Sequence, residues 1–191
     1  MKLHRENPDP YVGLSEVYKR HGRAKEGLSK LRQAISVDPT NPLLHLKLAE
    51  GLRDLGYKKQ ALRAIQHAIM LEPDKYFFHY WMGDLCLAMK EFEAALEAYR
   101  AAIELAPSDD HLFARASLAF WGAGKQPEAI KAIRLASDLN PEKLVYYGVL
   151  EQFLLHSGNL EEAELEGKRT RQLDAYDRDL VGRMMAEATA H

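Results

Sequence analysis

Prolines recur in this chain at a constant step of 34 residues, at Pro39, Pro73, Pro107 and Pro141. Alanines keep the same step in two series, Ala34, Ala68, Ala102, Ala136 and Ala61, Ala95, Ala129, Ala163. Glycines keep it at Gly22, Gly56, Gly124 and Gly158, and Lys90 replaces the glycine of the third unit. Several series with one step indicate a repeat architecture, in which each unit stacks on its neighbours.

Each unit is predicted to contain two helices. In residues 43–55 the leucines have helical spacing, at Leu44, Leu48, Leu52 and Leu55. Gly56 then ends this helix, because glycine adopts the left-handed cap conformation without a Cβ clash. A second apolar stripe follows, through Ala61, Leu62, Ile65, Ala68 and Ile69. Pro73 cannot continue a helix, so it marks the boundary between units.

A 34-residue helix–turn–helix unit with these landmarks resembles the tetratricopeptide repeat family. The family's aromatic fourth position holds Tyr11, His45, His79, Phe113 and Tyr147, and its small eighth position holds Ser15, Ala49, Gly83, Ser117 and, off pattern, Glu151. The resemblance implies an all-α fold, a right-handed α-solenoid of five repeats in a single domain over 1–191. The expected repeats are 8–41, 42–75, 76–109, 110–143 and a degenerate 144–175.

The fifth repeat departs from the family pattern where Gly167, Thr170 and Ala175 replace a large apolar residue, alanine and proline. After it, residues 177–189 are predicted to form a helix with Leu180, Val181, Met184 and Met185 on one side. A solenoid needs a polar-faced element over the exposed end of its core, so this segment is interpreted as a C-terminal capping helix.

Composition excludes several function classes. The formal net charge of −2 lacks the basic excess of a nucleic-acid-binding protein. One cysteine, Cys86, allows no internal disulfide, and no apolar run is long enough for direct membrane insertion. Residues 1–10 lack the apolar region of a signal peptide, so a cytoplasmic location is expected.

No catalytic, metal or cofactor signature is found. Gly122, Gly124 and Lys125 lack the spacing of a phosphate-binding loop. The eight histidines form no metal-ligand spacing, and His45 and His79 occupy the packing position of the repeat. Cys86 lies on an apolar stripe and is expected to be a buried residue. We therefore expect a protein that is not an enzyme and needs no cofactor.

The resemblance implies that the second, fifth, ninth and twelfth positions of each repeat face a concave groove. The residues expected there, as a peptide-binding groove, are Val12, Glu16, Leu46, Glu50, Arg53, Phe77, Tyr80, Asp84, Leu87, Ala114, Leu118, Trp121, Gln152 and Leu155. The groove is predicted to be charged over the first two repeats and apolar and aromatic from the third onward. Aromatic residues of this kind are typical anchors of protein interfaces.

The acidic series Glu16, Glu50 and Asp84 has two interpretations. It selects a basic ligand, or Glu16 with Lys19 and Glu50 with Arg53 form local pairs within their helices. The series disfavours the carboxylate-gripping grooves of chaperone co-adaptors, which are basic at these positions.

The predicted function is a non-catalytic scaffold or adaptor that binds an apolar protein or peptide segment of basic character. The alternatives are a self-associating structural protein and a chaperone-like holder of a secreted or membrane-bound substrate.

Overall fold

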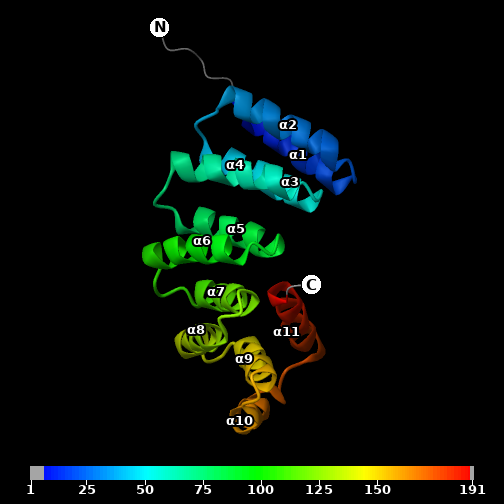
Figure 1. Cartoon of the computed structure of the whole chain (residues 1–191). Helices are drawn as coiled ribbons and strands as arrows, with labels where there is room; N and C mark the ends of the chain where they lie inside the picture. The colour runs from blue at the N-terminus through cyan, green and yellow to red at the C-terminus, as the bar shows by residue number, and fades with distance from the viewer. Residues whose placement is uncertain (1–6, 190–191) are drawn as a thin grey trace. The chain divides into compact units, whose positions relative to one another are not determined.

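The computed structural model describes residues 7–189, which form eleven α-helices and no β-strand (Figure 1). The five repeats contribute two helices each, as the sequence predicted, and one helix follows. The helices are α1 Asp9–Arg20, α2 Ala24–Val37, α3 Pro42–Asp54, α4 Lys58–Leu71, α5 Tyr76–Ala88, α6 Phe92–Leu105, α7 Asp110–Gly122, α8 Gln126–Leu139, α9 Leu144–His156, α10 Leu160–Thr170 and α11 Ala175–Ala188.

The turn between the two helices of a repeat has the same hydrogen bonding in all five repeats. The backbone N–H of Tyr57 donates to the carbonyl of Leu52 at 2.8 Å, and the other four turns have the equivalent bond at 2.9 Å. This is the bond of a Schellman cap, which requires a residue with positive φ just after the helix. Those residues are Gly22, Gly56, Lys90, Gly124 and Gly158, with φ between 62° and 79°.

The boundary between repeats is set by capping residues of the following helix. The Asn41 side chain accepts a hydrogen bond from the Leu43 N–H, and Asp109 accepts one from the His111 N–H. Pro42 occupies the first position of α3, where a missing N–H costs no helical hydrogen bond. The helices α3 and α7 therefore begin where the sequence places a side-chain acceptor, whereas α9 begins without one.

The chain divides into two compact units, with the boundary between Leu85 and Cys86, where the sequence predicted a single domain. In the first unit the core is formed by residues that include Ala61, Ile65, Ala68 and Phe78, all without exposed surface. Small residues let the helices approach closely. A Cβ atom on Gly27 would lie 2.9 Å from the Ser15 carbonyl oxygen of α1.

The core of the second unit repeats this arrangement. Ala95, Ala129 and Ile133 have no exposed surface, and neither has Phe153 of α9. The Trp121 ring stacks on Phe153 with 4.3 Å between the ring centroids. Aromatic stacking thus joins the first helices of the fourth and fifth repeats.

The last helix, α11, packs on α9 and α7, the first helices of the fifth and fourth repeats (Figure 1). The sequence predicted a helix at this place in the chain as a cover for the end of the stack. The outer helix α10, however, keeps Leu160 and Leu165 more than half exposed. The apolar side of α11 therefore packs against these first helices, and its residues Val181, Met184 and Ala188 are buried.

Candidate functional site

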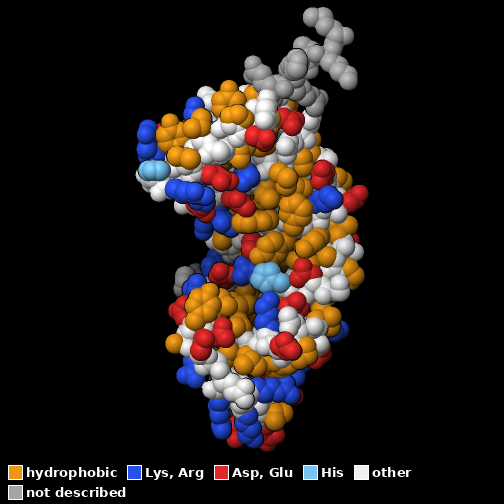
Figure 2. Space-filling model, turned by 180° about the vertical axis from the view of Figure 1, so that it is seen from behind, with side chains coloured by type: hydrophobic (Ala, Val, Ile, Leu, Met, Phe, Trp, Pro, Cys, Tyr) orange, Lys and Arg blue, Asp and Glu red, His pale blue; other side chains and the backbone are white. Residues whose placement is uncertain are grey.

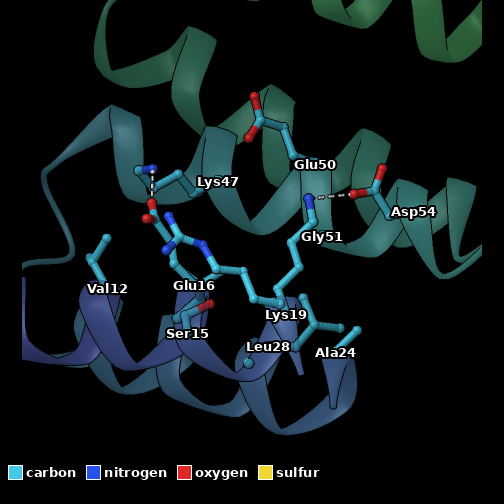
Figure 3. A pocket seen from close by; sticks show the side chains of 13 residues that line it. Val12, Ser15, Glu16, Lys19, Ala24, Leu28, Lys47, Glu50, Gly51 and Asp54 are labelled. Atoms are coloured by element: carbon cyan, nitrogen blue, oxygen red, sulfur yellow. Dashed lines mark hydrogen bonds and ion pairs between the residues drawn. The ribbon is translucent and has the colours of Figure 1, made fainter. Parts of the chain in front are cut away.

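A hollow of about 500 Å³ opens between α1, α2 and α3 of the first unit (Figure 3). Its apolar lining comes from Val12 of α1 and from Leu28 and Leu31 of α2. Ala24, Gly27 and Gly51 also line it. The hollow therefore has apolar walls from all three helices.

Charged side chains from α1 and α3 form the rim of the hollow. Lys47 of α3 donates to Glu16 of α1 at 3.1 Å, and Lys19 of α1 donates to Asp54 of α3 at 2.6 Å. Acidic and basic groups accordingly lie side by side, next to hydrophobic surface, over the first unit in the upper part of Figure 2. Both ion pairs join the first helix of one repeat to the first helix of the next.

These contacts lower the pKa of two carboxyl groups. The hydrogen bond and positive charge of Lys47 hold the pKa of Glu16 below its ordinary value. Partial burial acts to raise the pKa of Asp54, but hydrogen bonds from Lys19 and Arg53 outweigh it and lower that pKa. Both groups are therefore ionised at neutral pH.

Glu50 differs from the other acids of the rim. It lies on α3 between Lys47 and Asp54 and lines the hollow (Figure 3). Its half-exposed carboxylate has no hydrogen bond or ion pair with any other residue in the part of the chain that is described. A negative charge at the edge of an apolar hollow is thus left for a ligand.

The structure tests one of the two interpretations of the acidic series, the local pairs within the helices of the first two repeats. The predicted local pairs, Glu16 with Lys19 and Glu50 with Arg53, are not formed. Lys19 bonds to Asp54 instead, and Arg53 bonds to Asp54 and lies over the Trp81 ring, 4.4 Å from its centroid. Lys19 thus pairs with the first helix of the next repeat, whereas Arg53 pairs with its neighbour on its own helix.

Of the predicted groove residues, the structure brings Val12, Glu16 and Glu50 together in the hollow. Leu46 and Phe77 are partly buried and pack against the core of the first unit. Tyr80 and Asp84 of α5 are half-buried.

The predicted groove residues of the second unit divide into two groups. Leu87, Ala114 and Leu118 have no exposed surface and so offer nothing to a ligand. Ala114 and Leu118 lie on α7, one of the helices on which α11 packs. Trp121 and Gln152 are half-buried, and Leu155 is exposed.

The lining residues that sequence reasoning missed include Lys47, Asp54, Leu28 and Leu31. Lys47 and Asp54 flank the predicted Glu50 by three and four residues on the same helix. That helical spacing is the signal that could have found them. Leu28 and Leu31 belong to α2, and the family's groove positions lie only on first helices.

The described residues show no group suited to metal binding or nucleophilic chemistry. No cluster of three or more His, Cys, Asp or Glu side chains able to hold a metal ion occurs within residues 7–189. Burial, with a smaller contribution from Glu91, raises the pKa of the Cys86 thiol to about 11, which keeps it protonated. None of the described helices combines the length and apolar character needed to cross a membrane.

A family model described as Tetratricopeptide repeat matches residues 76–109, one full repeat. The third repeat of the chain therefore matches the tetratricopeptide repeat family. The predicted family and the all-α solenoid class are thereby confirmed. The tetratricopeptide repeat fold generally mediates protein–protein interaction and scaffolding.

Solved structures of tetratricopeptide repeat proteins share this fold. MamA residues 41 to the end from Desulfovibrio magneticus RS-1 is 23% identical with a TM-score of 0.80, covering 88% of this chain and 95% of that one. YrrB, described as a TPR protein with an unusual peptide-binding site, is 14% identical with a TM-score of 0.72, covering 94% of each chain. PilF of Pseudomonas aeruginosa is 17% identical with a TM-score of 0.73, covering 95% of this chain and 88% of that one. No curated protein sequence matches the chain.

Proposed function

We propose that this protein is a non-catalytic adaptor that binds an apolar peptide segment of basic character in the hollow between α1, α2 and α3. The observation that carries the proposal is an open apolar hollow with an unpaired carboxylate, Glu50, at its edge. The description of YrrB as a protein with a peptide-binding site supports a peptide as the class of ligand.

The apolar part of the hollow supplies the affinity. A ligand side chain that enters between α1 and α3 covers Val12 and meets the small residues Ala24 and Gly51 instead of bulky ones. Burial of one aliphatic side chain in such a site contributes about 1.5–3 kcal/mol. Apolar residues of the ligand that enter the hollow therefore raise its affinity.

The charged rim supplies the selectivity. Glu16 and Asp54 already have lysine partners, so they hold the rim in shape and attract a ligand weakly. Glu50 is unpaired and favours Lys or Arg in the ligand. Arg20 also lines the hollow, and its charge helps to lower the pKa of Glu16.

The remaining half-exposed groove residues of the first unit extend this surface in the proposal, namely Leu46, Arg53, Phe77, Tyr80 and Asp84. Trp121, Gln152 and Leu155 belong to the second unit and stay predicted groove residues of that unit. A cytoplasmic location and the absence of catalysis belong to the same proposal.

The proposal is tested by selecting peptides from a random 12-residue phage-displayed library on the full-length protein. The selected peptides are then measured by fluorescence anisotropy. We expect sequences with apolar residues next to Lys or Arg. Glu50→Arg should weaken their binding at least about tenfold, because an attraction at the rim becomes a repulsion.

Glu72→Arg is the matched control, since it makes the same charge change at an exposed residue that does not line the hollow. Val12→Glu is a second variant that fills the hollow from the opposite wall. Selected peptides that bind all three variants as tightly as the wild type would place the binding site elsewhere.

A further inference from the structure

The first helices of the second unit are covered by the chain's own last helix. Gly148 of α9 stands at a groove position of the family, and a Cβ atom there would lie 2.6 Å from Val181 Cγ2 of α11. Leu173, in the linker that precedes α11, is also buried, and it is the next nearest side chain to Gly148. The apolar side of α11 thus occupies the place that a groove ligand takes.

Lys90 holds the C-terminal end of α11. Its Nζ donates to the carbonyl oxygens of Ala186, Glu187 and Thr189 at 2.8–2.9 Å. These carbonyls belong to the last turn of α11 and the residue beyond it, where a helix leaves acceptors unsatisfied and carries negative partial charge. An ammonium group here acts as an external cap.

Lys90 makes this contact from a turn position that is unusual for a lysine. Lys90 has φ of 62° and stands where the other four repeats have glycine. A side chain in the left-handed region strains the backbone, so glycine is the residue that the turn alone favours. The third repeat accepts this strain at the one turn whose side chain reaches α11.

An ion pair orients α11 further. Arg115 of α7 lies 2.5 Å from the Glu187 carboxylate, and the arginine side chain is only 12% exposed. Arg115 is on the face of α7 toward α11, so the pair ties the last turn of α11 to a first helix.

The fit of α11 to this surface is partial. A hollow of about 480 Å³ lies between α9, α10 and α11, lined by Gln152, Arg171 and Met185 among others. Gly182 in the middle of α11 meets no other side chain and lowers the helix propensity. A 14-residue helix of this composition is marginal on its own in water.

We propose that α7, α9 and Lys90 form a receptor for an amphipathic helix, that α11 occupies it as an intramolecular ligand, and that a partner's helix replaces α11. This receptor lies in the second unit and is additional to the hollow of the first. The Lys90 cap and the Arg115 ion pair distinguish this receptor from the groove of the family in general.

The chemistry of α11 specifies the partner. The partner helix carries small or medium apolar residues spaced like Val181, Met184 and Ala188, at steps of three and four. It has an acidic residue at the place of Glu187, to meet Arg115. It ends within one turn of that acid, so that its free carbonyl groups reach Lys90.

The experiment uses the full chain and two fluorescein-labelled synthetic peptides of residues 174–189, one with the native sequence and one with Glu187→Arg. In the full chain, Glu187→Arg places like charges against each other at Arg115 and loosens α11. This chain should bind the native peptide at least about tenfold more tightly than the wild-type chain does, because its own helix competes less. It should bind the Glu187→Arg peptide at least about tenfold more weakly than the native one.

Asp179→Arg in the full chain is the matched control. It makes the same charge reversal on α11 at an exposed residue that pairs within its own helix, with Arg183 at 2.9 Å. This chain should bind the native peptide no better than the wild-type chain does.

Hydrogen–deuterium exchange shows whether α11 is released in each variant, so that each binding result can be interpreted. A second variant, Val181→Asp with Met184→Asp, releases α11 by removing its buried side chains, and α7 and α9 should stay protected in it. If both variants release α11 and neither binds the native peptide, α11 is only a structural element and the proposal fails. It fails equally if α11 stays protected in both variants, or if the two peptides bind alike.

Discussion

Two glycines of the second unit have opposite surroundings. Gly148 lies within α9 and faces Val181, which leaves no room for a methyl group. Gly182 lies within α11 and has no other side chain or backbone within 4 Å of a Cβ atom. The same substitution should therefore have opposite effects at the two positions.

Gly182→Ala should stabilise the docked α11 by about 1 kcal/mol, because alanine has the higher helix propensity and nothing obstructs it. Gly148→Ala should destabilise it by about 1–3 kcal/mol, because Val181 is branched at Cβ and α11 must shift to admit the methyl group. Amide exchange of α11 measures both effects, slower in the first variant and faster in the second. Slower exchange in both variants would mean that α11 does not lie against α9.

The off-pattern residues of the fifth repeat compensate one another. Thr170 donates to the Glu151 carboxylate at 2.7 Å. A Cβ atom on Gly167 would lie 2.8 Å from Glu151 Oε1, so glycine is what makes room for the acid. Glu151, Gly167 and Thr170 are separate departures from the family pattern in the sequence, and the structure brings these three together in one contact between α9 and α10.

The element that sequence reasoning placed least well is α11. Its existence and its apolar side could be predicted from spacing, and the structure begins it at Ala175, two residues before the predicted 177. Its partner could not be predicted. That choice depends on the short linker 171–174, on the space above Gly148 and on Lys90, about a hundred residues earlier in the chain. Helices of the repeats were predictable because their partners are set by the 34-residue step.

Lys90→Gly separates the role of Lys90 in the turn from its role in holding α11. Glycine matches the other four repeats and relieves about 1 kcal/mol of left-handed strain, so the turn should gain stability. The last turn of α11 loses three hydrogen bonds from an ammonium group, and its amides should exchange about tenfold faster or more. Hydrogen–deuterium exchange resolved by residue measures both effects.

Lys125→Ala is the control for that comparison. Lys125 also follows a first helix, but it pairs with Glu93 at 3.0 Å and has no bond to α11. Unchanged exchange of α11 in the Lys90→Gly chain would remove Lys90 from the contact that holds this helix.

At the scale of the whole chain, equivalent residues of different repeats make equivalent contacts. His45 and His79 occupy the fourth position, and the Nε2 of each lies within 3.0 Å of a proline carbonyl oxygen, that of Pro39 or Pro73. A proton on Nε2 allows each histidine to donate to that carbonyl, so these residues fasten a helix to the preceding proline turn. Sequence alone identified the packing position but not this bond, because the period shows which residues correspond and not which atoms meet.

The candidate site was less predictable than the fold for the same reason. The period placed Val12, Glu16 and Glu50 on one surface, and the structure brings these three together. It could not show that Lys47 and Lys19 neutralise two acids of the rim and leave Glu50 unpaired. Side-chain pairing across helices is not a periodic property.

Equivalent core positions test whether the repeats behave as locally stabilised units. Ile65 and Ile133 stand two repeats apart at the same place in the motif, one in each compact unit, and neither has exposed surface. Isoleucine to alanine in such a site costs about 2–5 kcal/mol. Because a repeat depends mainly on its neighbours, Ile65→Ala should raise amide exchange in α1–α4 and leave α8–α10 nearly unchanged, while Ile133→Ala should do the reverse. Urea unfolding followed by exchange mass spectrometry measures both, and a uniform rise over all helices in either variant would show that the chain unfolds as one cooperative body.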